Sequence, residues 1–154
     1  MTQHVRNHHT IRVAAPAHVA FKFFTPAGEE VWAPHWHPRY LYPADGTTQQ
    51  GQIFTTGEGD EFTIWQVADF DLAACRVRYV RTTPALRTGF VEVQCVQHGS
   101  DASDVLVSYE LTALTPPGEA TLAAYEGQAF ATMIDGWAAA IAAHLPQLLA
   151  APFR

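Results

Sequence analysis

The chain has 154 residues, a length that suits one domain over residues 1–154 with a sizeable hydrophobic core. Apolar residues make up 48% of the chain and charged residues 16%, which excludes the composition of a disordered protein. The formal net charge is −6, with only nine Lys and Arg, which argues against binding to nucleic acid or to an anionic membrane surface.

No run of about 18 apolar residues predicts a membrane-spanning helix. The first residues, "MTQHVRNHH", lack the apolar centre of a secretory signal, so a cytoplasmic location is expected. The only cysteines, Cys75 and Cys95, lie in strand-like runs. In that compartment we expect two free, buried thiols rather than a disulfide.

A strand and a short helix are predicted first in the chain. In "HTIRVAA", Ile11 and Val13 alternate with polar neighbours, which indicates a strand. Pro16 suits the first turn of a helix over "PAHVAFKFF", because its missing N–H would have no partner there in any case. That helix is too short to be stable alone, so it must pack on another element.

A second short helix is predicted over "TPAGEEVWA". Thr25 suits its N-cap, and Pro26 suits its first position. Glu29 and Glu30 lie near its N-terminus, where the helix dipole favours negative charge. Pro34 ends the helix, because proline cannot continue it.

Period-two patterns dominate the middle of the chain and predict antiparallel strands. "RYLYPA" is interpreted as a short strand, and "GQIFTTG" and "EFTIWQVADF" flank the turn "EGD" as a hairpin. "CRVRYVRT" follows, and "TGFVEVQCVQH" and "SDVLVSYELTAL" form a second hairpin about "GSDA". Each strand in these later runs has one apolar and one polar face, which is typical of a sheet covered on one side.

The apolar faces can be assigned from the alternation. The residues expected on them are Val105, Val107, Tyr109 and Leu111 in the last strand, Val91, Val93 and Cys95 before it, and Cys75, Val77, Tyr79 and Arg81 earlier. In "FTIW" the alternation does not decide between Ile64 and Trp65 as the inward residue.

A long helix is predicted from about Glu119 to Leu149, with Pro146 kinking or ending it near its last turn. Its apolar residues recur at three- and four-residue steps, so they form one stripe that can cover the sheet. The stripe consists of Phe130, Ile134, Trp137, Ile141 and Leu145.

This order of elements resembles the START-like, or SRPBCC, superfamily, which includes the birch-pollen allergen type, lipid-transfer domains and bacterial polyketide cyclases. The segments that carry the resemblance are "IRVAAPAHVAFKFFTPAGEEVWAPHWHPRY", "VSYELTAL" and "FATMIDGWAAAI". The resemblance implies an α+β helix-grip fold. In it, a curved antiparallel sheet of about six or seven strands wraps around the long C-terminal helix, two short helices after the first strand close one end, and a cavity separates sheet and helix.

The segment "VWAPHWHPRYLYP", residues 31–43, combines aromatic residues with helix breakers and admits three interpretations. His35 and His37 have a spacing that can bind zinc, but flanking prolines and the lack of a nearby carboxylate or cysteine disfavour a metal. The aromatic rings could simply pack the short helices on the sheet. In the superfamily this segment lies near the cavity mouth, so we expect Trp36 and Tyr40 to border the entrance.

The resemblance and the alternation together predict which residues line the cavity, although plain core packing remains the alternative for each. The predicted set is Trp36, Tyr40, Trp65, Tyr79, Arg81, Val93, Val107, Tyr109, Phe130, Met133, Ile134 and Trp137.

Arg81 is the one charged member of this set, and inside a cavity it could hold a ligand carboxylate or enolate in a bidentate contact. Alternatively, it reaches water at the strand end. Tyr79 and Tyr109 could orient a ligand carbonyl or bond to the backbone. Glu92 and Glu110 are expected to face outward, and no catalytic triad, phosphate loop or dinucleotide motif is present, so no catalytic residue is assigned.

The resemblance favours binding of a small or medium hydrophobic molecule, lipid-like or polyketide-like, without a metal or other cofactor. A cyclase or dehydratase that uses Arg81 and a tyrosine is the first alternative, and it is less favoured than a ligand-binding protein. A protein-interaction module with a filled core, resembling chaperone co-activators, is the second. A homodimer is compatible with the aromatic content but is not required by it.

Overall fold

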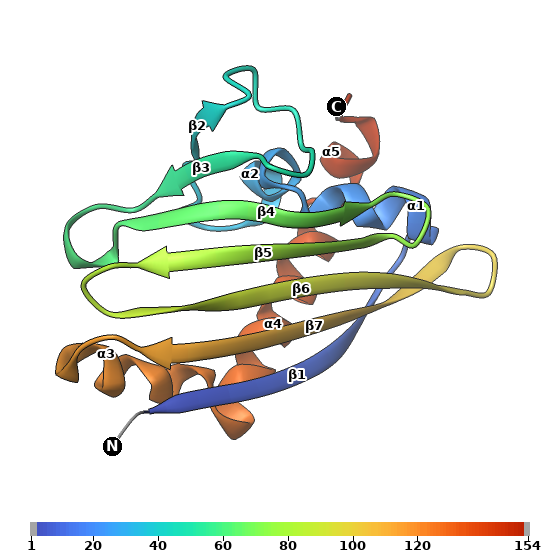
Figure 1. Ribbon diagram of the computed structural model, residues 1–154. Coiled ribbons are helices and arrows are strands. Elements are labelled where there is room, and N and C mark those ends of the chain that lie inside the picture. Colours follow the sequence, from blue (N-terminus) through green and yellow to red (C-terminus); the bar gives the residue numbers. More distant parts are fainter. Residues whose placement is uncertain (1–2, 153–154) are drawn as a thin grey trace.

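The structure is a computed structural model that describes residues 3–152 (Figure 1). Within these residues seven strands form one antiparallel sheet in the order β1-β7-β6-β5-β4-β3-β2. The strands are β1 (His4–Val13), β2 (Arg39–Tyr42), β3 (Ile53–Thr56), β4 (Thr63–Asp71), β5 (Arg76–Thr83), β6 (Arg87–His98) and β7 (Ala102–Ala113). The first strand therefore lies beside the last, and β2 and β1 form the two edges.

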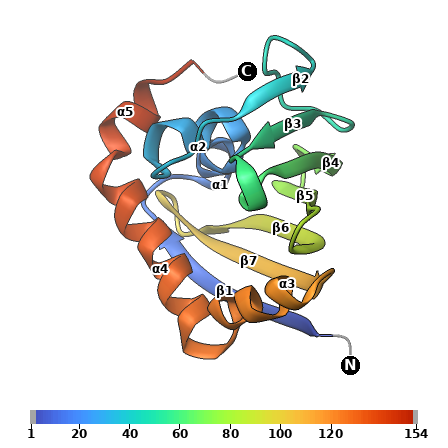
Figure 2. The same ribbon diagram turned by 90° about the vertical axis from the view of Figure 1, so that its left-hand side faces the viewer.

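Helices cover one face of this sheet (Figure 2). The helices and 3-10 turns of the described residues are α1 (Ala17–Ala20), η1 (Phe21–Phe24), α2 (Pro26–Trp32), the turn η2 (Gly59–Glu61) between β3 and β4, α3 (Pro116–Thr121), η3 (Leu122–Tyr125), α4 (Gly127–Ala143) and α5 (Leu145–Ala150). The predicted α+β helix-grip architecture, with short helices after the first strand, is confirmed. No helix in residues 3–152 is both long and apolar enough to cross a membrane.

Helix α2 begins as the sequence predicts. The Thr25 hydroxyl accepts a hydrogen bond of 3.1 Å from the Gly28 N–H, and Pro26 lies in the first turn. A Cβ atom at Gly28 would collide with the Lys22 carbonyl oxygen, so only glycine allows α2 to pack this closely against η1. This close packing places Trp32 in the core.

The long C-terminal helix is shorter than predicted: α4 spans Gly127–Ala143, not Glu119 to Leu149. Before it, Glu126 is extended and Gly127 has a φ of 48°, so the chain turns between η3 and α4. After it, Pro146 lies in the first turn of α5, where its ring ends the preceding helix as expected. The predicted helix is therefore three helices and a 3-10 turn.

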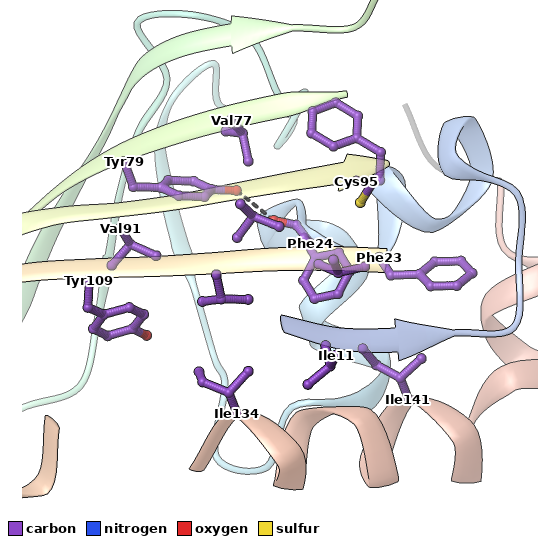
Figure 3. Packing of buried hydrophobic residues seen from close by; sticks show 14 of the residues in the cluster. Ile11, Phe23, Phe24, Val77, Tyr79, Val91, Cys95, Tyr109, Ile134 and Ile141 are labelled. Carbon is purple, nitrogen blue, oxygen red and sulfur yellow. Dashed lines mark hydrogen bonds between the residues drawn. The ribbon is translucent and has the colours of Figure 1, made fainter. Parts of the chain in front are cut away.

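The core lies between the inner face of the sheet and α4 (Figure 3). The predicted phase of β6 and β7 is confirmed, because the apolar members of both stripes are buried. Trp65, which the alternation left undecided, faces inward and is 7% exposed. Ile134 and Ile141 extend from α4 toward the sheet.

Both cysteines are buried free thiols, as predicted. The Cys95 N–H donates a hydrogen bond of 2.9 Å to the Cys75 carbonyl oxygen, so the two residues lie on neighbouring chain segments. Burial raises the pKa of the Cys95 thiol to about 12. This thiol is therefore protonated, and hence unreactive, at neutral pH.

A buried hydrogen bond joins the sheet to the short helices. The Tyr79 hydroxyl donates to the Phe24 carbonyl oxygen at 2.7 Å (Figure 3). We predict that Tyr79→Phe lowers the free energy of unfolding by about 1–3 kcal/mol, because a buried carbonyl loses its partner. Urea denaturation measures this loss. Tyr42→Phe, at a residue 56% exposed, is the control and should change stability by less than about 0.5 kcal/mol. Equal losses would contradict the assignment.

Candidate ligand-binding cavity

A cavity of about 510 Å³ lies between the sheet and α4. It is bordered by α2 and the segment after it, by strands β3 to β7, and by η3 and α4. Nine of its lining residues are aromatic, and they include all four tryptophans of the chain. The surface available to a ligand is therefore dominated by rigid rings.

A wall of stacked rings forms one side of the cavity. Phe54 of β3 and Trp65 of β4 are paired across the two strands, with centroids 5.7 Å apart and planes within 3° of parallel. Trp36 meets Trp65 edge to face at 5.5 Å. The indole N–H of Trp65 donates to the Thr56 hydroxyl, and that of Trp36 donates to the Pro26 carbonyl oxygen, both at 2.9 Å. With these groups satisfied, the rings offer apolar surface to a ligand.

The cavity meets solvent where its lining residues are exposed. Pro34, Glu61 and Gly136 are exposed and line the cavity. At the Glu61 end, Arg87 donates to the Glu61 carboxylate at 2.8 Å and to the Thr121 hydroxyl at 3.0 Å. The ion pair joins the β3–β4 connection to β6, and the hydrogen bond to Thr121 joins β6 to α3.

The segment of residues 31–43, which was predicted to lie near the cavity mouth, contains both lining and exposed residues. Trp36 is half-buried and lines the cavity, whereas His35 and His37 are exposed. Among residues 3–152, no group of three or more His, Cys, Asp or Glu side chains is placed to hold a metal ion.

Arg81 lines the cavity and is largely buried. It is 8% exposed, and its guanidinium lies 4.9 Å from the centre of the Trp65 ring. Its Nε atom is buried without a hydrogen-bond partner. The guanidinium also contacts the Tyr109 hydroxyl and lowers the pKa of Tyr109, although burial is the larger effect and raises that pKa overall.

Glu29 is a second ionisable group in the cavity, and the sequence analysis assigned it only to a helix terminus. Burial raises the pKa of its carboxyl well above the usual value. The spacing offered a signal that was not used: Trp32 follows by three residues, so both side chains lie on the same face of α2. Because Trp32 must be buried, Glu29 is carried inward with it.

Eight of the twelve residues predicted to line the cavity do so. They are Trp36, Trp65, Tyr79, Arg81, Val93, Tyr109, Met133 and Trp137. The Tyr79 hydroxyl bonds to the backbone, which was the alternative left open for it. Contact of these residues with a ligand stays a prediction.

The other four predicted residues, Tyr40, Val107, Phe130 and Ile134, do not line the cavity. The Tyr40 hydroxyl donates to the Glu30 carboxylate at 2.7 Å, on the exposed side of α2. The remaining three have no exposed surface and fill the closed part of the core. In this part of the core α4 packs closely against β1, so no free space remains between helix and sheet. No other strand lies as close to α4.

Solved structures share this architecture over nearly the whole chain. The norcoclaurine synthase of Thalictrum flavum, solved in complex with dopamine and hydroxybenzaldehyde, is 16% identical, with a TM-score of 0.63 over 93% of this chain and 89% of that chain. The Zhui aromatase/cyclase of a Streptomyces species is 16% identical, with a TM-score of 0.66 over 100% of both chains.

An uncharacterised protein of Rhizobium leguminosarum is 11% identical, with a TM-score of 0.67 over 93% of this chain and 97% of that chain. The protein has the helix-grip fold that these structures share. The resemblance stated from the sequence is therefore confirmed at the level of the fold. No protein-family model matches the sequence, and no curated protein matches it significantly. At these identities the helix-grip fold is what the proteins share.

Glu29 should make stability depend on pH. Its folded-state pKa lies above its unfolded-state value, so ionisation destabilises the fold as pH rises through the interval between the two. We predict that Glu29→Gln becomes increasingly more stable than the wild type as pH rises above the ordinary glutamate pKa of about 4.3. Urea denaturation at several pH values measures this difference. Glu30→Gln, on the exposed side of α2, removes the same charge and should show no such trend; an identical trend would refute the burial argument.

Proposed function

We propose that the protein binds a small to medium hydrophobic molecule in the cavity between the sheet and α4. The observation that carries this proposal is the aromatic lining of a cavity of about 510 Å³. Ligand-binding cavities of proteins typically have about 300–1,000 Å³ and a mostly apolar lining. Burial of apolar ligand surface supplies about 25 cal/mol per Å² before the cost of ordering the ligand is subtracted.

The shape of the lining favours a flat, polyketide-like ligand over a flexible lipid chain. Phe54 and Trp65 present nearly parallel rings, and Trp36 stands almost perpendicular to them. A planar ring system can pack against such rigid rings, whereas a flexible chain loses more conformational entropy when it is ordered there. The synthase of similar fold was solved with dopamine and hydroxybenzaldehyde, both small aromatic molecules, which supports the same preference.

A protein-interaction module with a filled core is disfavoured, because the space between sheet and helix is not filled. The cytoplasmic location, the single domain over residues 1–154 and a homodimer stay predictions. Mass spectrometry of gently purified protein, compared with a denatured sample, tests for a retained hydrophobic molecule.

Blocking the cavity should weaken binding without unfolding the protein. Ala140 lines the cavity on α4, and its neighbour Ala139 is exposed. We predict that Ala140→Phe weakens binding of a flat aromatic probe such as 2-naphthoate by at least about tenfold, or about 1.4 kcal/mol. Ala139→Phe adds the same ring outside the cavity and should bind like the wild type. Equal affinity of both variants, measured by equilibrium dialysis, would remove the cavity as the binding site.

An enzyme of the cyclase or dehydratase type is a second candidate, because Arg81 and the Tyr109 hydroxyl lie together in the cavity. A guanidinium and a hydroxyl can polarise a ligand carbonyl and stabilise the enolate that forms from it. We predict that the wild type accelerates the intramolecular aldol condensation of a linear aryl triketone, in which the enolate carbon forms a bond to a second ketone carbon, that oxygen is protonated, and one water molecule leaves. Mass spectrometry follows the loss of water. Arg81→Met should abolish this acceleration while binding of a neutral aromatic probe is retained. No acceleration by the wild type, or full acceleration by Arg81→Met, would reject this candidate.

A further inference from the structure

Arg81 carries a positive charge that no protein group neutralises. Its side chain is buried in the cavity, and among residues 3–152 no carboxylate lies within ion-pair distance of it. Its polar and aromatic neighbours are the neutral Tyr109 hydroxyl and the Trp65 ring, and its Nε atom has no hydrogen-bond partner. A buried charge of this kind is unfavourable unless an opposite charge binds to it.

The two carboxyl groups of the cavity do not fill this role. Glu61 lies at the mouth and forms its ion pair with Arg87, at 2.8 Å. Glu29 has no basic side chain within ion-pair distance among the described residues, and burial keeps its carboxyl in the neutral form over a wider pH range than usual. The charge of Arg81 is therefore left for a ligand.

Glu29 offers the cavity a different interaction. A protonated carboxyl has an O–H that donates a hydrogen bond, and its remaining oxygen accepts one. Among residues 3–152, the Glu29 carboxyl forms no side-chain hydrogen bond. Because Glu29 comes from α2 and Arg81 from β5, the two groups can contact different parts of one ligand.

Building on the proposed function, we propose that the ligand is a flat aromatic monoanion with a second, uncharged acceptor group. Its carboxylate, or an equivalent enolate or phenolate, accepts hydrogen bonds from Arg81. Its second group, such as a ketone oxygen, accepts a hydrogen bond from Glu29. The rings between them pack among the aromatic side chains that line the cavity.

The charges of the cavity also determine which classes of ligand should bind poorly. A second negative charge near Glu29 would find no cation there, so a dianion binds less well than a monoanion. A ligand ammonium group beside Arg81 would be repelled, because two like charges in an apolar environment interact strongly. An entirely apolar ligand leaves Arg81 unpaired, so it gains only the burial of its own surface.

Four matched naphthalenes test the proposal by equilibrium dialysis at about pH 5, just above the ordinary glutamate pKa of about 4.3, where the raised pKa favours a protonated Glu29 carboxyl and the naphthoates are mostly ionised. They are 2-ethylnaphthalene, which has neither group, 2-naphthoate, 2-acetylnaphthalene and 6-acetyl-2-naphthoate. We expect the wild type to bind 2-naphthoate at least about tenfold more tightly than 2-ethylnaphthalene, since a charge-assisted contact to Arg81 is added. The acetyl group should raise the affinity by a further factor of about three to ten, so 6-acetyl-2-naphthoate should bind most tightly.

Variants show which residue is responsible for each increase in affinity. Arg81→Met should remove the advantage of the carboxylate and leave the affinity for 2-ethylnaphthalene nearly unchanged. Glu29→Leu should remove the advantage of the acetyl group, whereas Glu29→Gln keeps an N–H donor and should retain it. Glu30→Gln, at an exposed position of the same helix, should behave like the wild type.

The outcomes separate this inference from the function on which it rests. If the wild type binds none of the four compounds, both the ligand-binding function and the inference are overturned. If it binds 2-ethylnaphthalene as tightly as 2-naphthoate, or if Arg81→Met keeps the carboxylate advantage, hydrophobic binding stands and the monoanion proposal is overturned. Comparison of the four ligands on the wild type alone decides this, even where a variant folds poorly.

Discussion

The whole arrangement depends on one mismatch: the longest helix on the apolar face of the seven-stranded sheet has only 17 residues. Such a helix is about 25 Å long and only about 10 Å wide, so it cannot pack against every strand. Figure 2 shows α4 beside β1 and farther from β4 and β5. Near β1 the side chains of both elements close the space; farther away, aromatic residues of α2, β3 and β4 line what is left as the cavity.

The sequence predicted the sheet well because period-two alternation depends only on neighbouring residues, as the buried stripe of β7 illustrates. It predicted the extent of the long helix poorly. The apolar stripe continues through the breaks at Glu126 and His144, and the backbone turn at Gly127 has no periodic signal. Only the break at Pro146 could be predicted from the residue type, because proline is tolerated in the first turn of a helix but not in its interior.

The lining was predicted only in part because alternation assigns a residue to a face and not to a distance from the facing helix. Val107 and Tyr109 share the inner face of β7, yet Val107 lies in the closed part of the core and Tyr109 in the cavity. The position of α4 relative to the strand decides between them, and this position depends on the whole fold. For Glu29, the three-residue spacing to Trp32 contained the information, but acidic residues in a first helical turn are usually explained by the dipole alone.

Under the proposed function, the polar groups of the cavity explain how a nearly apolar site selects its ligand. Had Glu29 and Arg81 met in an ion pair, their charges would have cancelled and the cavity would have favoured any hydrophobic molecule of the right size. They are instead separate: Arg81 remains charged beside Trp65, and burial favours the neutral form of Glu29. In the proposed complex each group gains a partner from the ligand, so the affinity supplied by the rings is directed by two hydrogen-bonding groups of different charge.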